Sequence, residues 1–188
     1  MIDWMHNEPV IIHEGIKSVM KGRIDMFCSS MKKVLVIGCP GSGKSTFSRA
    51  LHQLTNLPLY HLDLLYWNAD KTTVERDEFL KRLHDVLQRD EWIIDGNYAS
   101  SLEMRLSFCD TVFFLDYPVE VCLEGVRLRK GKPRSDMPWI EMEDDGEFIE
   151  FIKKFNEQIR PEILKLLQKY PDKEIYIFKC RDDADCFL

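Results

Sequence analysis

The sequence predicts an α/β fold in which helices cover both faces of a parallel sheet. Three observations lead to this prediction. From residue 33 onward, short apolar runs alternate with segments of helical periodicity, which is the pattern of a parallel sheet. A glycine-rich turn joins the first apolar run to the first helical segment. At 188 residues, the chain is long enough for one domain with a substantial core.

The first strand and the first helix meet at this turn. Residues 34–37 are continuously apolar and mostly β-branched, as expected of a strand that is buried on both faces. The turn covers residues 38–43. A helix is expected over 44–54, because apolar side chains recur on one of its faces, among them Phe47 and Leu51.

The next strand and helix enclose a polar loop. A short strand is expected over 57–61 and a loop over 68–73. Thr72 and Glu75 have the spacing of a capping box, which predicts that a helix starts there and runs to about Arg89.

Two further strands each end at a carboxylate. The apolar segments 92–94 and 111–115 are followed by Asp95 and Asp116. Pro118 then stands where a helix can begin, because the first turn of a helix does not need the missing N–H of proline.

The last third of the chain begins with a segment rich in glycine, proline and charge, 130–146, which we interpret as a mobile loop. Helical periodicity over 148–170 predicts a helix that is disturbed at Pro161. A fifth strand is expected over 174–178, and Asp182 opens a short terminal helix.

Residues 1–30 lack clear periodicity and precede a second methionine, Met31. We interpret them as an appendage to a domain that covers 31–188. The net charge of −6 argues against a general attraction to nucleic acid or anionic membrane. The sequence contains no apolar run long enough to span a membrane. The six cysteines are scattered, which favours free thiols and a cytoplasmic location.

The glycine-rich turn carries a phosphate-binding motif. Its glycines let consecutive N–H groups converge on an anion, and the N-terminus of the following helix faces the same point. Lys44 can reach the β- and γ-phosphates of a nucleoside triphosphate, and the Ser45 hydroxyl can ligate Mg²⁺. The strand before the motif and the helix after it are the context that a P-loop requires. The motif consists of Gly38, Cys39, Pro40, Gly41, Ser42, Gly43, Lys44 and Ser45.

A P-loop alone does not say what happens to the phosphate. The chain has no guanine-reading Asn-Lys-x-Asp segment and is short for a motor or helicase, which leaves mostly the small kinases. Such enzymes need a lid that excludes water. We expect the lid at about 127–146, where Arg127 and Arg134 would stabilise charge during phosphoryl transfer. Its cations are Arg127, Arg129, Lys130, Lys132 and Arg134.

Two carboxylates follow strands at the edge of the sheet where ligands bind. Asp95 could hold Mg²⁺ through water, and Asp63 could orient or deprotonate an acceptor. Arg105 and Arg160 could each clamp a phosphate, although a surface ion pair is an equally reasonable interpretation of either. Aromatic residues could line an acceptor pocket or belong to the core; these are Tyr60, Tyr66, Trp67 and Tyr98.

At this point the sequence resembles the FlaR-type topology modulation proteins, which are adenylate-kinase-like P-loop proteins. The resemblance covers about residues 31–188. Its specific parts are the P-loop and the stretch Ile-Ile-Asp-Gly-Asn-Tyr at 93–98. Weaker parts are Tyr-His-Leu-Asp at 60–63, Phe-Leu-Asp-Tyr-Pro at 114–118 and the basic segment 130–136.

The resemblance implies a P-loop kinase fold, a three-layer α/β/α arrangement with a five-stranded parallel sheet in the order 2-3-1-4-5. It implies ATP and Mg²⁺ at Gly41 to Thr46, a closing lid near 127–134, and a loop with Arg181 against the adenine. One departure concerns the acceptor. Adenylate kinases follow the Asp-Gly pair with Phe-Pro-Arg, whose arginine grips the phosphate of the acceptor, whereas Asn97-Tyr98-Ala99 stands here.

We therefore predict an ATP- and Mg²⁺-dependent kinase, similar to nucleoside monophosphate kinases, with Lys44, Asp63, Arg127 and Arg134 as catalytic residues and Ser45 and Asp95 at the metal. The acceptor is a small molecule, and nucleotides are among the candidates. The chain would be a monomer or homodimer. Two alternatives stay open: an ATP-binding regulator that affects DNA topology without transferring phosphate, and a nucleic-acid-binding accessory protein. The acidic charge and the lack of a basic stripe count against direct nucleic-acid binding.

Overall fold

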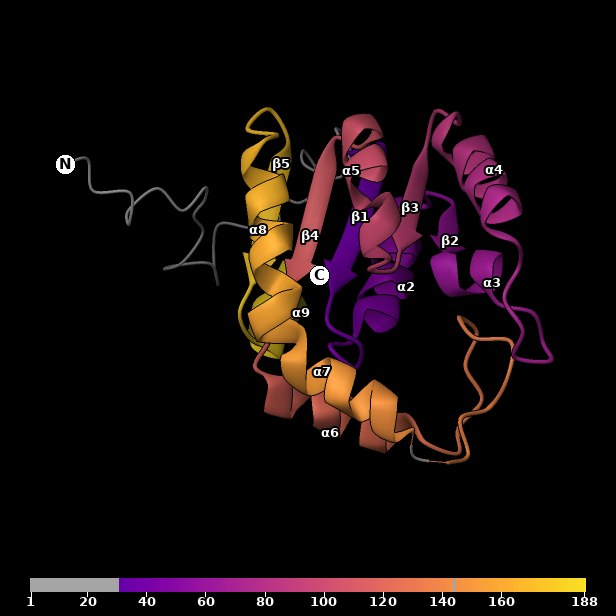
Figure 1. Cartoon of the computed structure of the whole chain (residues 1–188). Coiled ribbons are helices and arrows are strands. Elements are labelled where there is room, and N and C mark those ends of the chain that lie inside the picture. The colour runs from indigo at the N-terminus through magenta and orange to yellow at the C-terminus, as the bar shows by residue number, and fades with distance from the viewer. Residues whose placement is uncertain (1–30, 144) are drawn as a thin grey trace.

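The computed structural model describes residues 31–143 and 145–188; the predicted appendage, 1–30, lies outside them. Five parallel strands form one sheet in the order β2-β3-β1-β4-β5 (Figure 1), which confirms the predicted fold class and strand order. The strands are β1 (Lys33–Gly38), β2 (Leu59–His61), β3 (Trp92–Asp95), β4 (Thr111–Leu115) and β5 (Glu174–Phe178).

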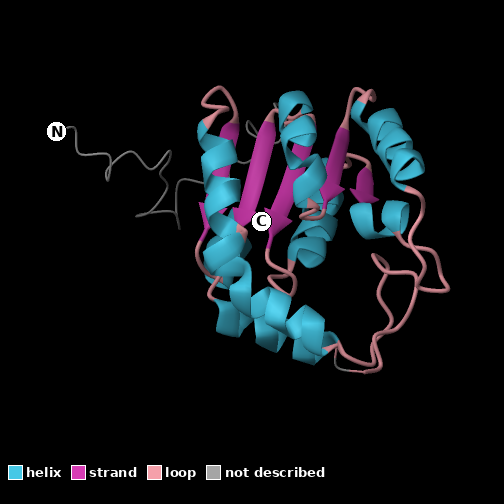
Figure 2. Ribbon diagram, in the orientation of Figure 1, coloured by secondary structure: helices cyan, strands magenta, loops and turns pink. Residues whose placement is uncertain are grey.

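Helices cover both faces of this sheet and give the molecule three layers (Figure 2). In Figure 1, α5 and α8 lie in front of the sheet and α2 lies behind it. The carboxyl ends of the strands point toward α6 and α7, which contact each other. The helices are α2 (Lys44–Thr55), α3 (Leu62–Tyr66), α4 (Arg76–Leu87), α5 (Ala99–Phe108), α6 (Val119–Arg129), α7 (Gly146–Gln158), α8 (Arg160–Gln168) and α9 (Arg181–Phe187).

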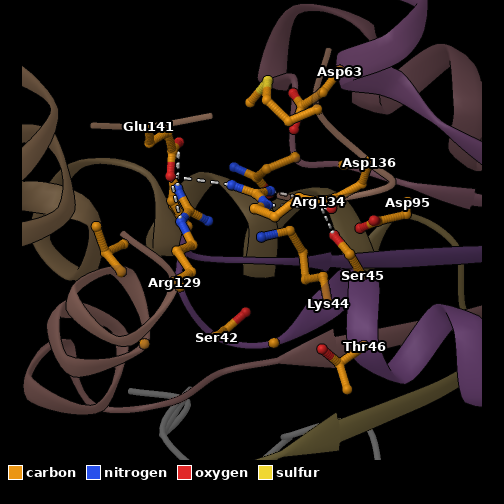
Figure 3. A pocket seen from close by; sticks show the side chains of 18 of the residues that line it. Ser42, Lys44, Ser45, Thr46, Asp63, Asp95, Arg129, Arg134, Asp136 and Glu141 are labelled. Carbon is orange, nitrogen blue, oxygen red and sulfur yellow. Dashed lines mark hydrogen bonds and ion pairs between the residues drawn. The ribbon is translucent and has the colours of Figure 1, made fainter. Parts of the chain in front are cut away.

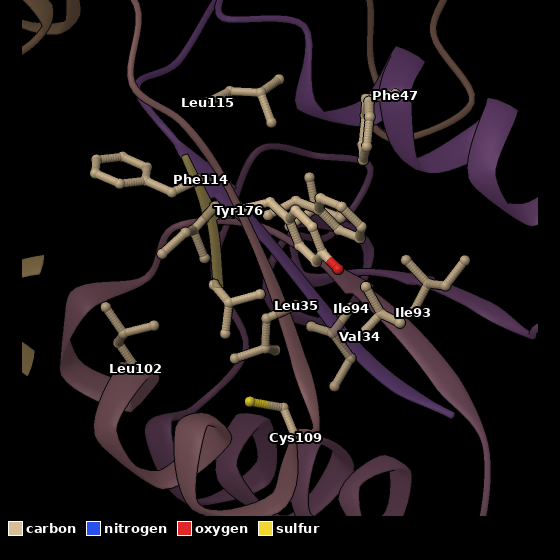
Figure 4. Close-up of a cluster of buried hydrophobic side chains, with 14 of the residues drawn as sticks. Val34, Leu35, Phe47, Ile93, Ile94, Leu102, Cys109, Phe114, Leu115 and Tyr176 are labelled. Carbon is tan, nitrogen blue, oxygen red and sulfur yellow. The ribbon is translucent and has the colours of Figure 1, made fainter. Parts of the chain in front are cut away.

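The core is centred on the middle strands, whose side chains are buried on both faces (Figure 4). This explains why β1 and β4 are continuously apolar rather than alternating. On one face, Phe113 of β4 packs against Phe47 of α2 and Phe187 of α9, with ring centroids 5.0 and 4.9 Å apart. These aromatic contacts fix α2, and therefore the turn before it, against the sheet.

One predicted helix start is wrong. Glu75, not Thr72, is the N-cap of α4, and the helix begins at Arg76. The Thr72 hydroxyl donates to Asp70 and accepts from Asn68. Thr72 thus belongs to a turn, which is closed by an isolated bridge between Trp67 and Thr73. Its side chain is therefore not available to cap a helix.

Two helices were not placed by the sequence analysis. Helix α3 has only five residues, too few to show a period. The buried face of α5 includes Ser101 and Arg105, so polar residues obscure its amphipathic pattern. The loop predicted from residue 130 is confirmed, because α6 ends at Arg129 and the described residues 130–143 form no helix or strand. That this loop acts as a lid stays a prediction.

The break in the long C-terminal helix is confirmed: α7 ends at Gln158, and Pro161 lies in the first turn of α8. In the described part of the chain, no helix combines the length and apolar character that crossing a membrane requires. The cysteines that the structure describes are free thiols, and Cys28 lies outside those residues.

Candidate active site

A large cavity of about 1660 Å³ opens at the carboxyl ends of the strands. Its walls come from the P-loop, the start of α3, the loop after β3 and the segment after α6 (Figure 3). The predicted nucleotide-binding residues Pro40 to Thr46 and Arg181 line this cavity, whereas Gly38 lies beneath it at the end of β1. The structure therefore brings together segments that are up to about 140 residues apart in the sequence, as expected for the ligand crevice of an open α/β sheet.

The P-loop turns tightly enough to require glycine at two positions. Gly41 has φ +85°, and a Cβ there would lie 2.0 Å from the Cys122 carbonyl oxygen of α6. Gly43 has φ +94° and begins α2, and a Cβ there would meet nothing within 4 Å. The space at Gly43 leaves the N-terminus of α2 open to an anion. The Lys44 ammonium donates 2.9 Å to the Cys39 carbonyl and reaches across the loop.

Asp95 ends β3 and is almost completely buried. Its Oδ2 lies 2.8 Å from Nδ1 of His61, which ends the neighbouring strand β2. Among the residues that the structure describes, its Oδ1 has no hydrogen-bond partner. Since a buried carboxylate oxygen is costly to leave unpaired, this atom is suited to receive a ligand or a water molecule that a ligand holds.

Asp63 lies in the first turn of α3 and lines the cavity. Tyr98 donates a 2.7 Å hydrogen bond from its hydroxyl to Asp63 Oδ1. Burial raises the pKa of the Asp63 carboxyl, the hydrogen bond from Tyr98 lowers it, and the charge of Asp95 raises it further; the net effect is an increase. A carboxylate with a raised pKa is a better proton acceptor, as the predicted role of Asp63 requires.

Arg105 does not face the cavity, so its suggested role as a phosphate clamp is wrong. Its side chain is fully buried, and burial lowers its pKa to about 10. The guanidinium donates to the carbonyls of Gly96, Asn97 and Tyr98 at 2.9 to 3.2 Å and to that of Ser101 at 3.3 Å. Arg105 thus holds in place the loop that connects Asp95 to Tyr98.

Arg160 is engaged in an ion pair rather than directed at a ligand. It donates two hydrogen bonds to the buried Asp116, at 2.7 and 2.8 Å, and Lys179 donates a third at 2.7 Å. Burial alone would raise the pKa of Asp116, but these hydrogen bonds outweigh it and the net pKa is lowered. The three residues connect the ends of β4 and β5 to the start of α8, which is a structural role.

The predicted lid residues separate into two groups. Arg127 is exposed, pairs with Glu124 one turn before it on α6, and is not among the residues that line the cavity. Its helical position turns it toward solvent, away from where a catalytic residue is needed. Arg129 and Arg134 do line the cavity, and both donate to Glu141. Arg129 and Arg134, but not Arg127, therefore face the cavity.

Asp136 was not among the residues predicted for this site, although it lies next to one of them. This lid residue is buried, accepts a 2.7 Å hydrogen bond from the Ser45 hydroxyl, and accepts another from Arg134 at 3.2 Å. Ser45 was the predicted metal ligand, so a second carboxylate lies beside that site. One feature of the sequence could have indicated Asp136: it is an acidic residue within an otherwise basic segment, two positions after Arg134.

The aromatic residues occupy different environments. Trp67 and Tyr98 line the cavity together with Trp139 of the lid, and the rings of Trp67 and Trp139 meet edge to face at 5.3 Å. Tyr66 lies behind them, with its ring against that of Tyr98 at 5.1 Å. Tyr60 accepts a hydrogen bond from Arg89 and is not among the lining residues. Only part of the predicted aromatic set thus faces the cavity.

The residues present fit a magnesium ion and a nucleoside triphosphate. Gly43 leaves space at the N-terminus of α2, Lys44 lies beside it, and Asp95 offers an unpartnered oxygen next to Ser45 (Figure 3). Within 31–143 and 145–188, no group of three His, Cys, Asp or Glu side chains is arranged to hold a metal by itself. Mg²⁺ is usually held by one or two carboxylates together with phosphates and water.

Comparisons with known proteins point in the same direction. No family model matches the chain. Adenylate kinase from Thermotoga petrophila is 31% identical over 91 residues, which are 47% of this chain and 40% of that protein. The uncharacterized protein YqaC from Bacillus subtilis is 35% identical over 104 residues, 53% of this chain and 57% of that protein. The chain thus spans less than two thirds of the length of these relatives.

Shikimate kinase from Bacteroides thetaiotaomicron has a similar structure, with a TM-score of 0.59 and 20% identity over 84% of this chain and 94% of that one. This similarity shows the fold, that of the P-loop kinases. Together these comparisons show similarity to an adenylate kinase over about half of this chain and the fold of a shikimate kinase over most of it. A regulator that affects DNA topology stays an alternative that the resemblance suggested.

Proposed function

We propose that the protein is an ATP-dependent phosphotransferase that acts on a small-molecule acceptor. The observation that carries this proposal is the convergence of three kinds of group in one cavity: the P-loop with Lys44, the carboxylates Asp63 and Asp95, and the guanidinium of Arg134. A protein that only binds ATP would need the P-loop but not a carboxylate with a raised pKa and an arginine beside it.

Each group has a role in phosphoryl transfer. The P-loop N–H groups and Lys44 would hold the β- and γ-phosphates, and Ser45 and Asp95 would hold the magnesium ion. When bound, that ion neutralises charge on the phosphates. Arg134 would stabilise the negative charge that spreads over the transferring group.

Asp63 would accept the proton of an acceptor hydroxyl. Tyr98 holds one carboxylate oxygen through its hydrogen bond and leaves the other for the acceptor. The nearby Lys44 and Arg134 lower the pKa of Asp63, against the larger effect of burial. This arrangement supports a carboxylate that takes up a proton more readily than an ordinary aspartate does.

The acceptor side of the cavity suits an uncharged hydroxyl compound. Arg105 and Arg160 are engaged by backbone carbonyls and by Asp116. Trp67, Tyr98 and Trp139 offer ring surface there. Lys71 also lines the cavity, but a flexible ammonium cannot give the bidentate grip that an arginine gives a phosphate. Nucleoside monophosphates are therefore weaker candidates than neutral alcohols.

The test compares Arg134→Ala with the wild-type protein in two measurements made in parallel, ADP release with a panel of acceptors and ATP affinity by calorimetry. A kinase loses more turnover than affinity, because Arg134 acts mainly on the transition state. The expected loss in turnover is about 10³-fold, by analogy with other arginines that contact a transferring phosphoryl group. A regulator would show no acceptor-dependent ADP release, and the substitution would then change affinity alone.

A further inference from the structure

The lid carries a carboxylate that reaches the predicted metal site, although no part of the phosphoryl transfer described above uses it. We propose that Asp136 is an oxygen donor to the magnesium ion, so that metal binding and lid closure are one event. This inference rests on the proposed function, because it presumes that Mg²⁺ and a nucleoside triphosphate bind at the P-loop.

The contact between the lid and the P-loop is direct. The Ser45 hydroxyl donates to Asp136 Oδ2 at 2.7 Å, across 91 positions in the sequence. The Asp136 side chain is only 3% exposed. Arg49 of α2 approaches the other oxygen at 3.9 Å and donates to the Ser135 hydroxyl at 3.4 Å. The lid is therefore attached to the start of α2 at the residue that a P-loop uses for its metal.

A second, independent feature points to a ligand at the same place. Oδ1 of Asp95 is buried and has no hydrogen-bond partner among the described residues. In Figure 3, the Asp95 carboxylate points into the same part of the cavity as Ser45 and Asp136. Two carboxylates and a hydroxyl thus surround one point, and all three belong to the oxygen donors that Mg²⁺ prefers.

The charges around Asp136 support this role. Arg134 donates to both oxygens of Asp136, so a positive charge is paired with the buried carboxylate. Arg134 is also the residue that we expect at the transferring phosphate. One short segment, 134–136, therefore carries a contact for the phosphate and a contact for the metal, and the two move together with the lid.

This arrangement has a thermodynamic consequence. If Asp136 contributes to the metal site only when the lid is closed, Mg²⁺ binds the closed state more tightly and must shift the protein toward it. Because the phosphates of the nucleotide also hold the metal, Mg²⁺ then favours the closed lid only when a nucleotide is bound. The opposite role for Asp136 is competition, in which its hydrogen bond keeps the Ser45 hydroxyl from the metal. The two roles predict opposite effects of removing the carboxylate.

The test measures how much Mg²⁺ strengthens binding of the non-hydrolysable analogue AMPPNP, by calorimetry with Mg²⁺ and with EDTA. Lid closure is followed in the same samples by tryptophan fluorescence. Trp139 lies in the lid, and its ring contacts that of Trp67. Asp136→Asn is compared with the wild type and with Glu141→Gln. The control removes a lid carboxylate that also accepts from Arg134 but makes no contact with Ser45. If Asp136→Asn does not fold, Asp136→Ser gives the same comparison.

In the wild type and in Glu141→Gln, we expect Mg²⁺ to strengthen AMPPNP binding and to change the tryptophan emission. In Asp136→Asn, the strengthening should fall by about tenfold or more, the size of effect seen when groups around a metal are removed. Affinity in EDTA should change far less. An unchanged or greater response to Mg²⁺ in Asp136→Asn would overturn the inference while leaving the proposed function intact. If the wild type does not bind AMPPNP at all, both are wrong.

Discussion

The Tyr98 hydroxyl donates a hydrogen bond to the Asp63 carboxylate over 2.7 Å. This contact connects the loop after β3 to the helix after β2, and it places Asp63 in the cavity beside the P-loop. Asp63 supplies the acid–base chemistry of the proposed reaction, whereas Tyr98 sets its orientation and restrains its pKa.

The pH dependence of turnover should report this pair. Burial raises the pKa of Asp63 above its ordinary value, and only the ionised form can accept a proton. Turnover should therefore fall as the pH decreases through the raised pKa. In Tyr98→Phe, the loss of a hydrogen bond that lowers this pKa should move the acid limb to higher pH. Asp63→Asn should reduce turnover by about 10²- to 10⁴-fold. The acid limb of the pH profile should disappear in this variant, while ATP affinity stays the same. An acid limb that is identical in Tyr98→Phe would contradict this assignment.

Arg105 should contribute mainly to stability. It is fully buried and satisfies four backbone carbonyls, including those of Gly96 and Tyr98. Arg105→Met would leave these acceptors without partners in the interior, at an expected cost of about 4 kcal/mol in the free energy of unfolding. Urea denaturation measures this. Arg82→Ala is the control, because it breaks an exposed pair with Glu78 and should cost less than about 1 kcal/mol. Equal losses in the two variants would argue against the role of Arg105.

Asp116 should contribute to stability at neutral pH. Its pKa in the folded protein is lowered, since the hydrogen bonds from Arg160 and Lys179 outweigh its burial. A folded-state pKa below the unfolded value means that this stabilisation is present above the unfolded pKa, about 4, and is lost as the pH falls through the folded one. Between pH 7 and pH 3, the Tm of Asp116→Asn should decrease less than the Tm of the wild type. At pH 7, the Tm of the variant should already be lower than that of the wild type. Parallel curves for the variant and the wild type would contradict the assignment.

Nucleoside monophosphates should be poor acceptors. Both arginines that the sequence suggested as clamps for an acceptor phosphate are engaged elsewhere: Arg105 by the carbonyls after β3 and Arg160 by Asp116. The measurement is ADP release with AMP, CMP, GMP and UMP, compared with the corresponding nucleosides and with neutral sugars and polyols. We expect the monophosphates to give no more than the background rate. Saturable ADP release with any of them would show that the cavity binds an acceptor phosphate through other groups.

The parts of the fold that sequence reasoning predicted best are those with strong local signals. The limits of β4 and β5 are as predicted, because their apolar runs are bounded by polar turns. The P-loop carries its own spacing and context. In contrast, α5 was missed because Arg105 and Ser101 lie on its buried face, and only the tertiary structure shows that backbone carbonyls satisfy the arginine.

The site was predicted unevenly for the same reason. Lys44, Asp63 and Asp95 follow strands or the P-loop, so topology alone brings them to one edge of the sheet. The lid is different, because the end of α6 determines which of the charged side chains face the cavity. That helix continues through Arg129 and turns Arg127 outward. The role of Asp136 depends on a contact across 91 positions, which no local pattern reveals.

Transfer of the γ-phosphate to a small molecule is the central claim, and label transfer from [γ-³²P]ATP tests it most directly. The wild-type protein and Lys44→Ala are incubated with Mg²⁺, labelled ATP and a deproteinised extract of cellular metabolites, and the products are separated by chromatography. The account predicts a labelled small molecule, distinct from inorganic phosphate, that forms with the wild type and not with Lys44→Ala. Label that remains in ATP or appears only as inorganic phosphate, in a wild-type protein that binds Mg²⁺ and ATP, would contradict it.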